Sequence, residues 1–590
     1  MSRRQHHKEQ NIVKNNILYD TLDVFKESSF FLLILMTFIL VITNILFIVK
    51  ISISKMHFPL IFCISIITYY LYRKKQLKKT LLSVIIATLF LLLSTFAIGR
   101  IYDITADGNT YHKLAVGALK NGWNPLYSSV GDYNLKQGNA FDILKDNVNV
   151  KWVDHYARGT ETFAAVIYAA TGNIECGKVF NILWIYIGIF ILFYILRQMK
   201  LSEWKSLLIA IVMSVNPIII THISNYYLDG VLAISLFVII LICCIQVKWE
   251  DTDDVKDNYL ILAMAVIWCV NTKFTGLVYA AVFAGVLYLY RHIYNYLYKK
   301  KTYKRKLIND TIFYIITVVF AVIIVGSNTY TKNFVSHGHP FYPLYGKGHV
   351  QNMVRMEIPK SIQNYSHGKL FLLSIFAMGE NVSPSYETYI NEPELKIPFT
   401  ITKREISNYN SPDIRMGGFG PWFSGIFIIS VIAITYLLIS KVKNKEYDKL
   451  ILLSVLILTS CLLVLLLDGS YWARYIPYIY LLPIYAIIGI ENNGNKQIGK
   501  YFFVAMIFLC AINSSVILLS QTKYTYTQTM MVEKRLNNYK KYCNKNKLVT
   551  IRLYHNGVQG IQYNLDDIQA NNYKLVEDQT LKRIGYNFFY

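Results

Sequence analysis

The chain is poor in charged residues for its length. Only 16% of its 590 residues are charged, whereas soluble proteins average about 25%. The eight cysteines form no C-x-x-C pair and most lie within apolar runs, so neither a disulfide framework nor a zinc site is expected. No glycine-rich turn follows a strand and opens a βα unit, which argues against a nucleotide-binding fold. These absences exclude most classes of soluble enzyme.

Long apolar runs take the place of charge. Hydrophobic residues make up 54% of the chain and the mean hydropathy is +0.33. A run of about 20 apolar residues matches the thickness of a bilayer. The sequence therefore predicts an all-α polytopic membrane protein with about thirteen spans, at 29–49, 56–72, 80–98, 177–197, 207–224, 230–247, 258–270, 274–291, 310–328, 421–440, 450–467, 476–491 and 501–521.

Basic residues gather in the short segments between spans. The net charge is +24, and its placement in loops favours the positive-inside rule over binding to nucleic acid. The segments 73–79, 299–306 and 441–449 and the N-terminal stretch all fall on one side of the thirteen-span count. We therefore expect a multi-pass protein of the plasma membrane, with a cytoplasmic N-terminus and an extracytoplasmic C-terminus.

The spans divide the chain into six parts. An N-terminal part with three spans (1–98) precedes a long outer loop (99–176), and further spans (177–328) precede a second one (329–420). The last spans (421–521) lead to an extracytoplasmic C-terminal domain (522–590). This tail is expected to be a small α/β unit with a helix at 525–546 and strands at 548–554 and 561–565. Three long polar stretches then lie on the outer face, which is more typical of a membrane enzyme than of a transporter.

Two acids open the first outer loop. Asp103 and Asp107 are four residues apart, so on a helix they share a face just outside the third span. A carboxylate there can deprotonate a hydroxyl or bind a cation. The spacing alone leaves a helix cap or a pair of solvated interface acids equally open.

The order of the outer segments resembles a known family. The D-x-x-x-D pair is followed by Y-H (111–112), G-W-N-P (122–125) and WVDHYARG (152–159). Further matches are NYYLDG (225–230), NTKFTG (271–276), GHPFYPLYG (338–346), RMGGFGP (415–421) and YWARYIP (471–477). Together they resemble the membrane glycosyltransferases of the GT-C superfold, which include protein O-mannosyltransferases and aminoarabinose transferases. Two extra predicted spans precede the acidic loop here, and an Asp pair replaces the Asp-Glu dipeptide of several members.

The resemblance implies a reaction and a donor. The donor is a sugar on a polyprenyl phosphate, and the acceptor is a cell-envelope polysaccharide, glycolipid or protein on the outer face. Such a transfer builds oxocarbenium character at the anomeric carbon. It needs a base for the acceptor hydroxyl and cations for the departing phosphate. Asp107 matches the acidic position before the Y-H element and is the expected base, with Asp103 assisting it.

Three cationic residues are candidates for the donor phosphate. Arg474 lies at an outer junction between two spans, where a guanidinium can bind phosphate oxygens with two hydrogen bonds. It is equally well interpreted as an interfacial Arg among aromatic residues. Lys273 occupies a short outer turn and either binds phosphate or marks the interface. His339 belongs to an H-x-H element in a proline-containing loop, whose simpler interpretation is a rigid loop.

The remaining candidates concern the acceptor or a second site. They are Asp154, His155, Tyr111, His112 and Asp229, and a turn-forming Asp-Gly is the simpler interpretation of Asp229. No cofactor is expected with certainty, and the use of a divalent cation stays open because no ligand spacing is tight. Two other functions are also open: a lipid-linked oligosaccharide flippase or other transporter, and an enzyme like the O-antigen polymerases and ligases.

Overall fold

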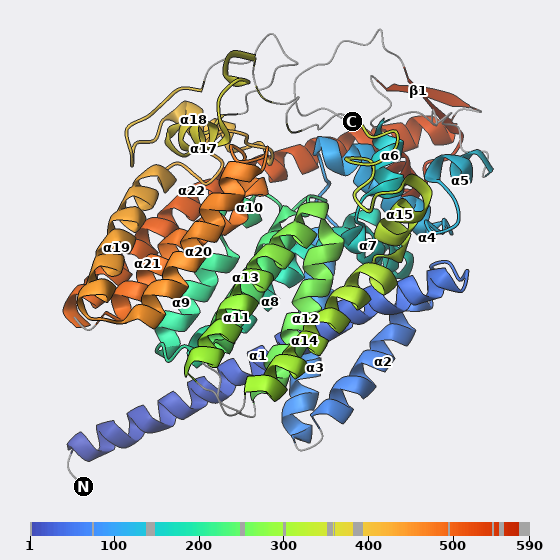
Figure 1. Cartoon of the computed structure of the whole chain (residues 1–590). Coiled ribbons are helices and arrows are strands. Elements are labelled where there is room, and N and C mark those ends of the chain that lie inside the picture. The colour runs from blue at the N-terminus through green and yellow to red at the C-terminus, as the bar shows by residue number, and fades with distance from the viewer. Residues whose placement is uncertain are drawn as a thin grey trace.

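A computed structural model gives the fold of most of the chain. It describes residues 3–73, 76–136, 148–247, 254–298, 303–350, 360–380, 393–493, 496–545, 548–553 and 560–577, together with Val354 and Ile358. The fold is almost entirely helical (Figure 1). Parts of the predicted outer stretches (137–147, 381–392 and 578–590) and of the basic segments (74–75 and 299–302) lie outside the described residues.

Nine helices of the described residues are long and apolar enough to cross a membrane. Each corresponds to one of the thirteen expected spans. These helices are α1 (Arg3–Ile48), α3 (Leu77–Ile98), α8 (Val179–Gln198), α11 (Asp229–Gln246), α13 (Phe274–Tyr298), α14 (Tyr303–Val319, continued by a π-helical turn to Val325), α19 (Phe423–Lys443), α20 (Tyr447–Leu466) and α22 (Lys496–Lys545). The result is compatible with a multi-pass membrane protein, although the count of thirteen is not reached.

The other four expected spans form shorter or less apolar helices. They are α2 (His57–Tyr72), α9 (Glu203–Ser214), α12 (Asp254–Thr272) and α21 (Leu481–Glu491). The prediction of one continuous span at 207–224 is wrong, because α9 ends at Ser214 and a separate turn, α10 (Pro217–Ile220), follows. Asn216 accepts hydrogen bonds from the first amides of α10, with Pro217 at its first position, and this arrangement starts a new helix.

Short elements fill the segments between the long helices. The α-helices are α4 (Lys113–Lys120), α5 (Val130–Lys136), α6 (Val148–His155), α7 (Gly159–Thr171), α15 (Lys332–His337), α17 (His367–Phe376), α18 (Lys403–Asn408) and α23 (Gly560–Asp567). Three π-helical turns are η1 (Gly108–His112), η3 (Phe320–Val325) and η4 (Ser327–Thr331). The 3₁₀ turns are η2 (Ile174–Lys178), η5 (Lys360–Ile362), η6 (Ala473–Tyr475) and η7 (Pro477–Tyr480).

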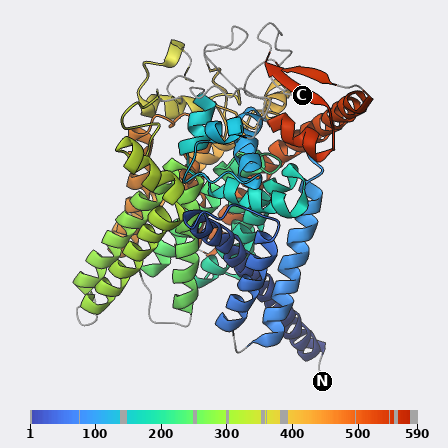
Figure 2. The same cartoon turned by 90° about the vertical axis from the view of Figure 1, so that its right-hand side faces the viewer.

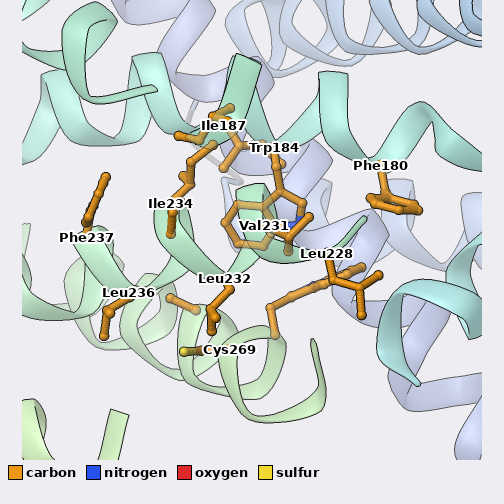
Figure 3. Close-up of a cluster of buried hydrophobic side chains, with 14 of the residues drawn as sticks. Phe180, Trp184, Ile187, Leu228, Val231, Leu232, Ile234, Leu236, Phe237 and Cys269 are labelled. Atoms are coloured by element: carbon orange, nitrogen blue, oxygen red, sulfur yellow. The ribbon is translucent and has the colours of Figure 1, made fainter. Parts of the chain in front are cut away.

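Helix α11 is the centre of the bundle. Almost every residue from Asp229 to Gln246 is buried, and the helix packs against α8, α12 and α13. Figure 3 shows the apolar side chains of this contact, among them Trp184 of α8 and Cys269 of α12. Peripheral helices instead expose apolar faces, such as Leu89, Leu92 and Leu93 of α3. Exposed apolar surface of this extent needs a covering, which a bilayer provides.

The tail continues the last long helix. Helix α22 carries the expected tail helix as far as Lys545 in one uninterrupted run, and β1 (Val549–Leu553) lies within the first expected strand. The expected strand at 561–565 is wrong, because these residues form α23, and the second strand is β2 (Tyr573–Glu577), parallel to β1. Ile561 and Leu565, four apart, are both buried, which is the spacing of one helix face.

Helix α23 contacts the beginning of the first outer stretch. Asn564 accepts a hydrogen bond from Lys113 (2.9 Å) and donates one to Glu175 (2.9 Å). Lys113 also contacts Glu175 directly at 2.6 Å, and all three side chains are buried. In Figures 1 and 2, the N-terminal end of α1 lies at one end of the bundle, and β1 lies at the other. The tail is therefore anchored to the segment that carries the acidic pair.

Candidate active site

A cavity of about 580 Å³ opens where several helices begin or end. Its wall combines the start of α11 and α13, the end of α20, and the turns η1 and η6. Seven of the ten residues predicted from the sequence line it: Asp107, Tyr111, His112, Asp229, Lys273, His339 and Arg474. Folding thus brings together residues that are up to 367 positions apart.

The turn η1 aims three of these side chains at the cavity. Asp107 directly precedes the π-helical turn Gly108–His112, and Asp107, Tyr111 and His112 all line the cavity. In a π-helix the hydrogen bonds join residues five apart, so positions 107 and 112 come one above the other. Burial raises the pKa of Tyr111 well above its usual value, and the nearby charge of Asp107 adds to this effect. The Tyr111 phenol therefore stays protonated and can donate a hydrogen bond.

Arg474 is surrounded by three carboxylates. Its guanidinium nitrogens lie 3.5 Å from Asp107, 3.7 Å from Asp229 and 3.5 Å from Asp413. These distances allow strong attraction but are longer than good hydrogen bonds. Burial alone would lower the pKa of Arg474, yet the carboxylates, Asp413 first, raise it well above its ordinary value. The charged guanidinium thus has donors that no close acceptor uses among the described residues.

A second cation lies beside it. The Lys273 ammonium contacts Asp229 at 2.8 Å and lies 3.9 Å from the centre of the Tyr475 ring. The Arg474 guanidinium stacks over the Trp472 ring at 4.2 Å. Aromatic faces attract cations, so these rings fix both charges without neutralising them.

Asp103 lies outside the cavity wall. Its carboxylate is fully buried and accepts hydrogen bonds from the Thr105 amide (2.8 Å), the Thr105 hydroxyl (2.7 Å) and the Tyr226 amide (2.7 Å). Burial raises its pKa, although Lys113 and Lys178 act in the opposite direction. A Cβ on Gly108 would lie only 2.0 Å from this carboxylate. Asp103 therefore holds the backbone that precedes η1 instead of facing a ligand.

Asp154 and His155 also lie outside the cavity wall. Asp154 accepts a hydrogen bond from the Val130 amide (2.6 Å), and burial raises its pKa to about 6. The Nδ1 atom of His155 lies 2.8 Å from Oδ1 of Asn333, whose amide donates to the His155 carbonyl. Burial lowers the pKa of His155 to about 3. His155 therefore joins the first outer stretch to α15 of the second, whereas Asp154 holds a turn within the first.

Several lining residues were not predicted from the sequence. Asp413 and Arg415 come from the segment just before the RMGGFGP glycines, and Trp472 precedes Arg474 by two positions. Two backbone segments approach each other closely at these glycines, because a Cβ on Gly417 would lie 2.8 Å from the Gly379 amide nitrogen. The D-x-R spacing beside a glycine cluster on the outer side was the available signal.

His339 presents one ring nitrogen to its own loop. Its Nδ1 accepts a hydrogen bond from the Phe341 amide (3.1 Å), which leaves the Nε2 proton as a donor. Among the described residues, no group of three or more His, Cys, Asp or Glu side chains is placed to hold a metal ion. The divalent cation stays an open prediction, and no step below depends on one.

Comparison with protein-family models, with curated proteins and with solved structures gave no match for this chain. The chemistry of the cavity therefore carries the functional interpretation.

Proposed function

We propose that the chain is a glycosyltransferase that moves a sugar from a polyprenyl-phosphate donor to a hydroxyl of a cell-envelope acceptor. The observation that carries this proposal is the composition of the cavity. One part of its wall holds a buried guanidinium with three carboxylates, and another part is apolar and continuous with exposed apolar surface. A lipid-linked phosphate requires a cation for its phosphate and an apolar surface for its lipid.

The apolar part supports a lipid-linked donor. Phe274 and Val278 of α13 and Leu467 after α20 line the cavity together with Leu466. Leu466 is 65% exposed, and Leu462 and Leu465 on the same helix are also exposed. Both α13 and α20 are long enough to cross a membrane. A lipid tail can therefore lie against the bilayer-facing surface while its phosphate enters the cavity.

Binding of the phosphate also explains how the base is released. Asp107 is the most exposed carboxylate around Arg474, with 27% of its side chain accessible, against 3% for Asp229 and 21% for Asp413. A donor phosphodiester carries one negative charge and can replace Asp107 beside the guanidinium, charge for charge. The displaced Asp107 carboxylate is then available to accept a hydrogen bond from the acceptor hydroxyl.

The reaction balances with these groups. The acceptor oxygen bonds to the anomeric carbon, its proton passes to Asp107, and the bond from the anomeric carbon to the phosphate oxygen breaks. Charge grows on the departing lipid phosphate, where Arg474 and Lys273 stabilise it. Asp103 acts indirectly, by fixing the backbone that leads to Asp107.

The proposal includes a location. The cavity lies at the end of the bundle where the long polar stretches gather, and the positive-inside rule assigns that end to the extracytoplasmic face of the plasma membrane. Polysaccharide, glycolipid and protein acceptors each offer a hydroxyl for this reaction.

Turnover of a labelled donor tests this function. Purified protein in vesicles is incubated with a panel of radiolabelled polyprenyl-phosphate sugars and an envelope extract, and free polyprenyl phosphate is measured. We expect release of lipid phosphate together with transfer of the label. Movement of intact donor between leaflets without any release would instead favour the flippase.

A further inference from the structure

His112 and Glu161 form a buried pair in the cavity wall. The Nδ1 atom of His112 lies 2.7 Å from Oε1 of Glu161, and Oε2 of Glu161 accepts a hydrogen bond from the Thr160 hydroxyl (2.9 Å). Both members of the pair are buried. The donor-binding and transfer steps described above use neither residue.

The position of Glu161 is fixed by close packing. Glu161 lies in the first turn of α7, where an acidic residue is favoured by the helix dipole. The start of α7 touches the end of α12 so closely that a Cβ on Gly159 would lie 2.8 Å from the Asn271 carbonyl oxygen. The backbone at the start of α7 is therefore held in place, and the Glu161 carboxylate orients the His112 ring through its contact with Nδ1.

This contact selects one tautomer of His112. A carboxylate beside Nδ1 places the imidazole proton on that nitrogen and leaves the lone pair on Nε2. Among the residues that the structure describes, Glu161 is the only hydrogen-bond partner of the His112 ring. Because His112 lines the cavity, Nε2 is the nitrogen available to a group inside it.

We propose that His112, oriented by Glu161, takes the acceptor's proton from Asp107 and so restores the base after each transfer. This inference rests on the proposed function. Asp107 directly precedes η1 and His112 ends it; the two residues are five positions apart, the spacing joined by a π-helical hydrogen bond, and both line the cavity.

The proton follows a balanced route. The acceptor O–H bond breaks and the proton joins the Asp107 carboxylate, and the carboxylic acid then gives it to Nε2 of His112. The imidazolium that forms is balanced by the charge of Glu161. Loss of the proton to water at the cavity mouth completes the cycle. Asp107 is thus the catalytic base, His112 the proton carrier, and Glu161 a positioning residue.

Rapid-mixing kinetics distinguishes this role from a structural one. A first turnover requires only Asp107, whereas later turnovers require His112. We expect His112→Gln to release one equivalent of lipid phosphate at close to the wild-type rate and then to turn over about 10²-fold more slowly, the scale of acid–base contributions. Glu161→Gln should show the same kinetics as His112→Gln. The amide of the substituted side chain donates to Nδ1, so the imidazole proton moves to Nε2, which then cannot accept the proton from Asp107. Asp107→Asn should lack the first equivalent.

A matched control is His292 of α13, near the end of that helix that lies away from the cavity. His292 is buried near Asp310 (3.6 Å), which makes a second histidine–carboxylate pair. It lies 18 residues beyond Phe274, about 27 Å along the helix. His292→Gln should keep wild-type kinetics in both phases.

Chemical modification supplies a readout without activity. Diethyl pyrocarbonate reacts with unprotonated imidazole nitrogens that it can reach. His112 lines the cavity, whereas both ring nitrogens of His292 are fully buried, so we expect the reagent to modify His112 but not His292. An unmodified His112, or steady turnover by His112→Gln at the wild-type rate, overturns the inference while the proposed function stands. A wild-type protein that turns over no donor refutes the proposed function, and the inference falls with it.

Discussion

At the scale of the residue, Arg474 decides the chemistry of the cavity. The sequence predicts a guanidinium at an outer junction, and the structure adds the three carboxylates that surround it. Its fork of donors is aimed by packing on Trp472. A lysine has the charge but lacks the planar fork.

Substitution of Arg474 should therefore weaken both binding and departure of the phosphate. We expect Arg474→Ala to lower kcat/KM for the donor by about 10²- to 10³-fold, the scale of a lost electrostatic contact in the transition state. Arg474→Lys should restore only part of the loss. Steady-state kinetics over a range of donor concentrations measures both effects. Wild-type kcat/KM in the alanine variant would assign the arginine to the membrane interface instead.

Gly108 tests the supporting role of Asp103. A Cβ at this position would overlap the Asp103 carboxylate at 2.0 Å and the Thr105 hydroxyl oxygen at 2.6 Å. We expect Gly108→Ala to cost about 1–3 kcal/mol of stability through overpacking, and to lower kcat by displacing η1. Thermal unfolding in detergent and turnover are the measurements.

The matched control is Gly285→Ala in α13, where nothing lies within 4 Å of the added methyl group. Alanine there should leave turnover unchanged and stability equal or slightly higher. If Gly108→Ala behaved like Gly285→Ala, Asp103 would not be needed to position the base.

Most of the residues predicted from the sequence do line the cavity, but the sequence did not predict which role each of them has. Asp107, Lys273 and Arg474 lie beside apolar runs, so their place at the outer ends of helices follows from hydropathy. Asp103 has the same setting, yet it points away from the cavity because Thr105 and Tyr226 bind it. The direction in which such an acidic side chain points depends on local hydrogen bonds to the backbone, and these do not follow from the spacing of residues in the sequence.

At the scale of the element, the strongest apolar runs were predicted well. The structure contains the long helices that the sequence predicts, because a run of about 20 apolar residues matches the thickness of a bilayer and fits few structures other than a membrane-crossing helix. The failures occur where polar capping interrupts an apolar run, as at Asn216, or where tertiary contacts select the structure, as in α23. A five-residue segment such as 561–565 fits a strand or a helix equally well until Asn564 meets Lys113 and Glu175.

The contact between α6 and α15 should respond to acid. Burial lowers the pKa of His155 to about 3 from an ordinary value of 6.5. Neutral His155 therefore stabilises the fold fully above pH 6.5, and this stabilisation is lost as the pH falls toward 3. Asp154, with a pKa raised to about 6, acts in the opposite sense, since its stabilisation is lost as the pH rises through 6.

His155→Gln keeps a hydrogen-bonding side chain beside Asn333 and removes the imidazole that titrates. We expect the fall in melting temperature between pH 7 and pH 4.5 to be smaller in this variant than in the wild type. His349→Gln, at an exposed position, is the control and should keep the wild-type acid sensitivity. Equal pH profiles for His155→Gln and the wild type would contradict a buried neutral His155.

At the scale of the whole molecule, the proposal depends on which end of the bundle faces outward. Native Cys543 does not suit labelling with an impermeant maleimide, because its side chain is fully buried. Its neighbour Tyr542 is 62% exposed near the end of α22.

Tyr542→Cys should therefore be labelled by the impermeant maleimide in intact cells. Lys443→Cys, at the exposed end of α19, should be labelled only after permeabilisation, because that end belongs to the basic side. The wild type gives the background from native cysteines. The reverse pattern would place the cavity on the cytoplasmic face and remove it from an envelope acceptor.

Donor turnover by Asp107→Asn beside the wild type tests the central claim most directly. With a radiolabelled polyprenyl-phosphate sugar in vesicles, the wild type should release lipid phosphate. The variant should be about 10²-fold or more slower in kcat. Its donor Kd should be unchanged or lower, because Arg474 loses a competing carboxylate. No turnover of any donor by the wild type, or equal kcat in the two proteins, would contradict the account.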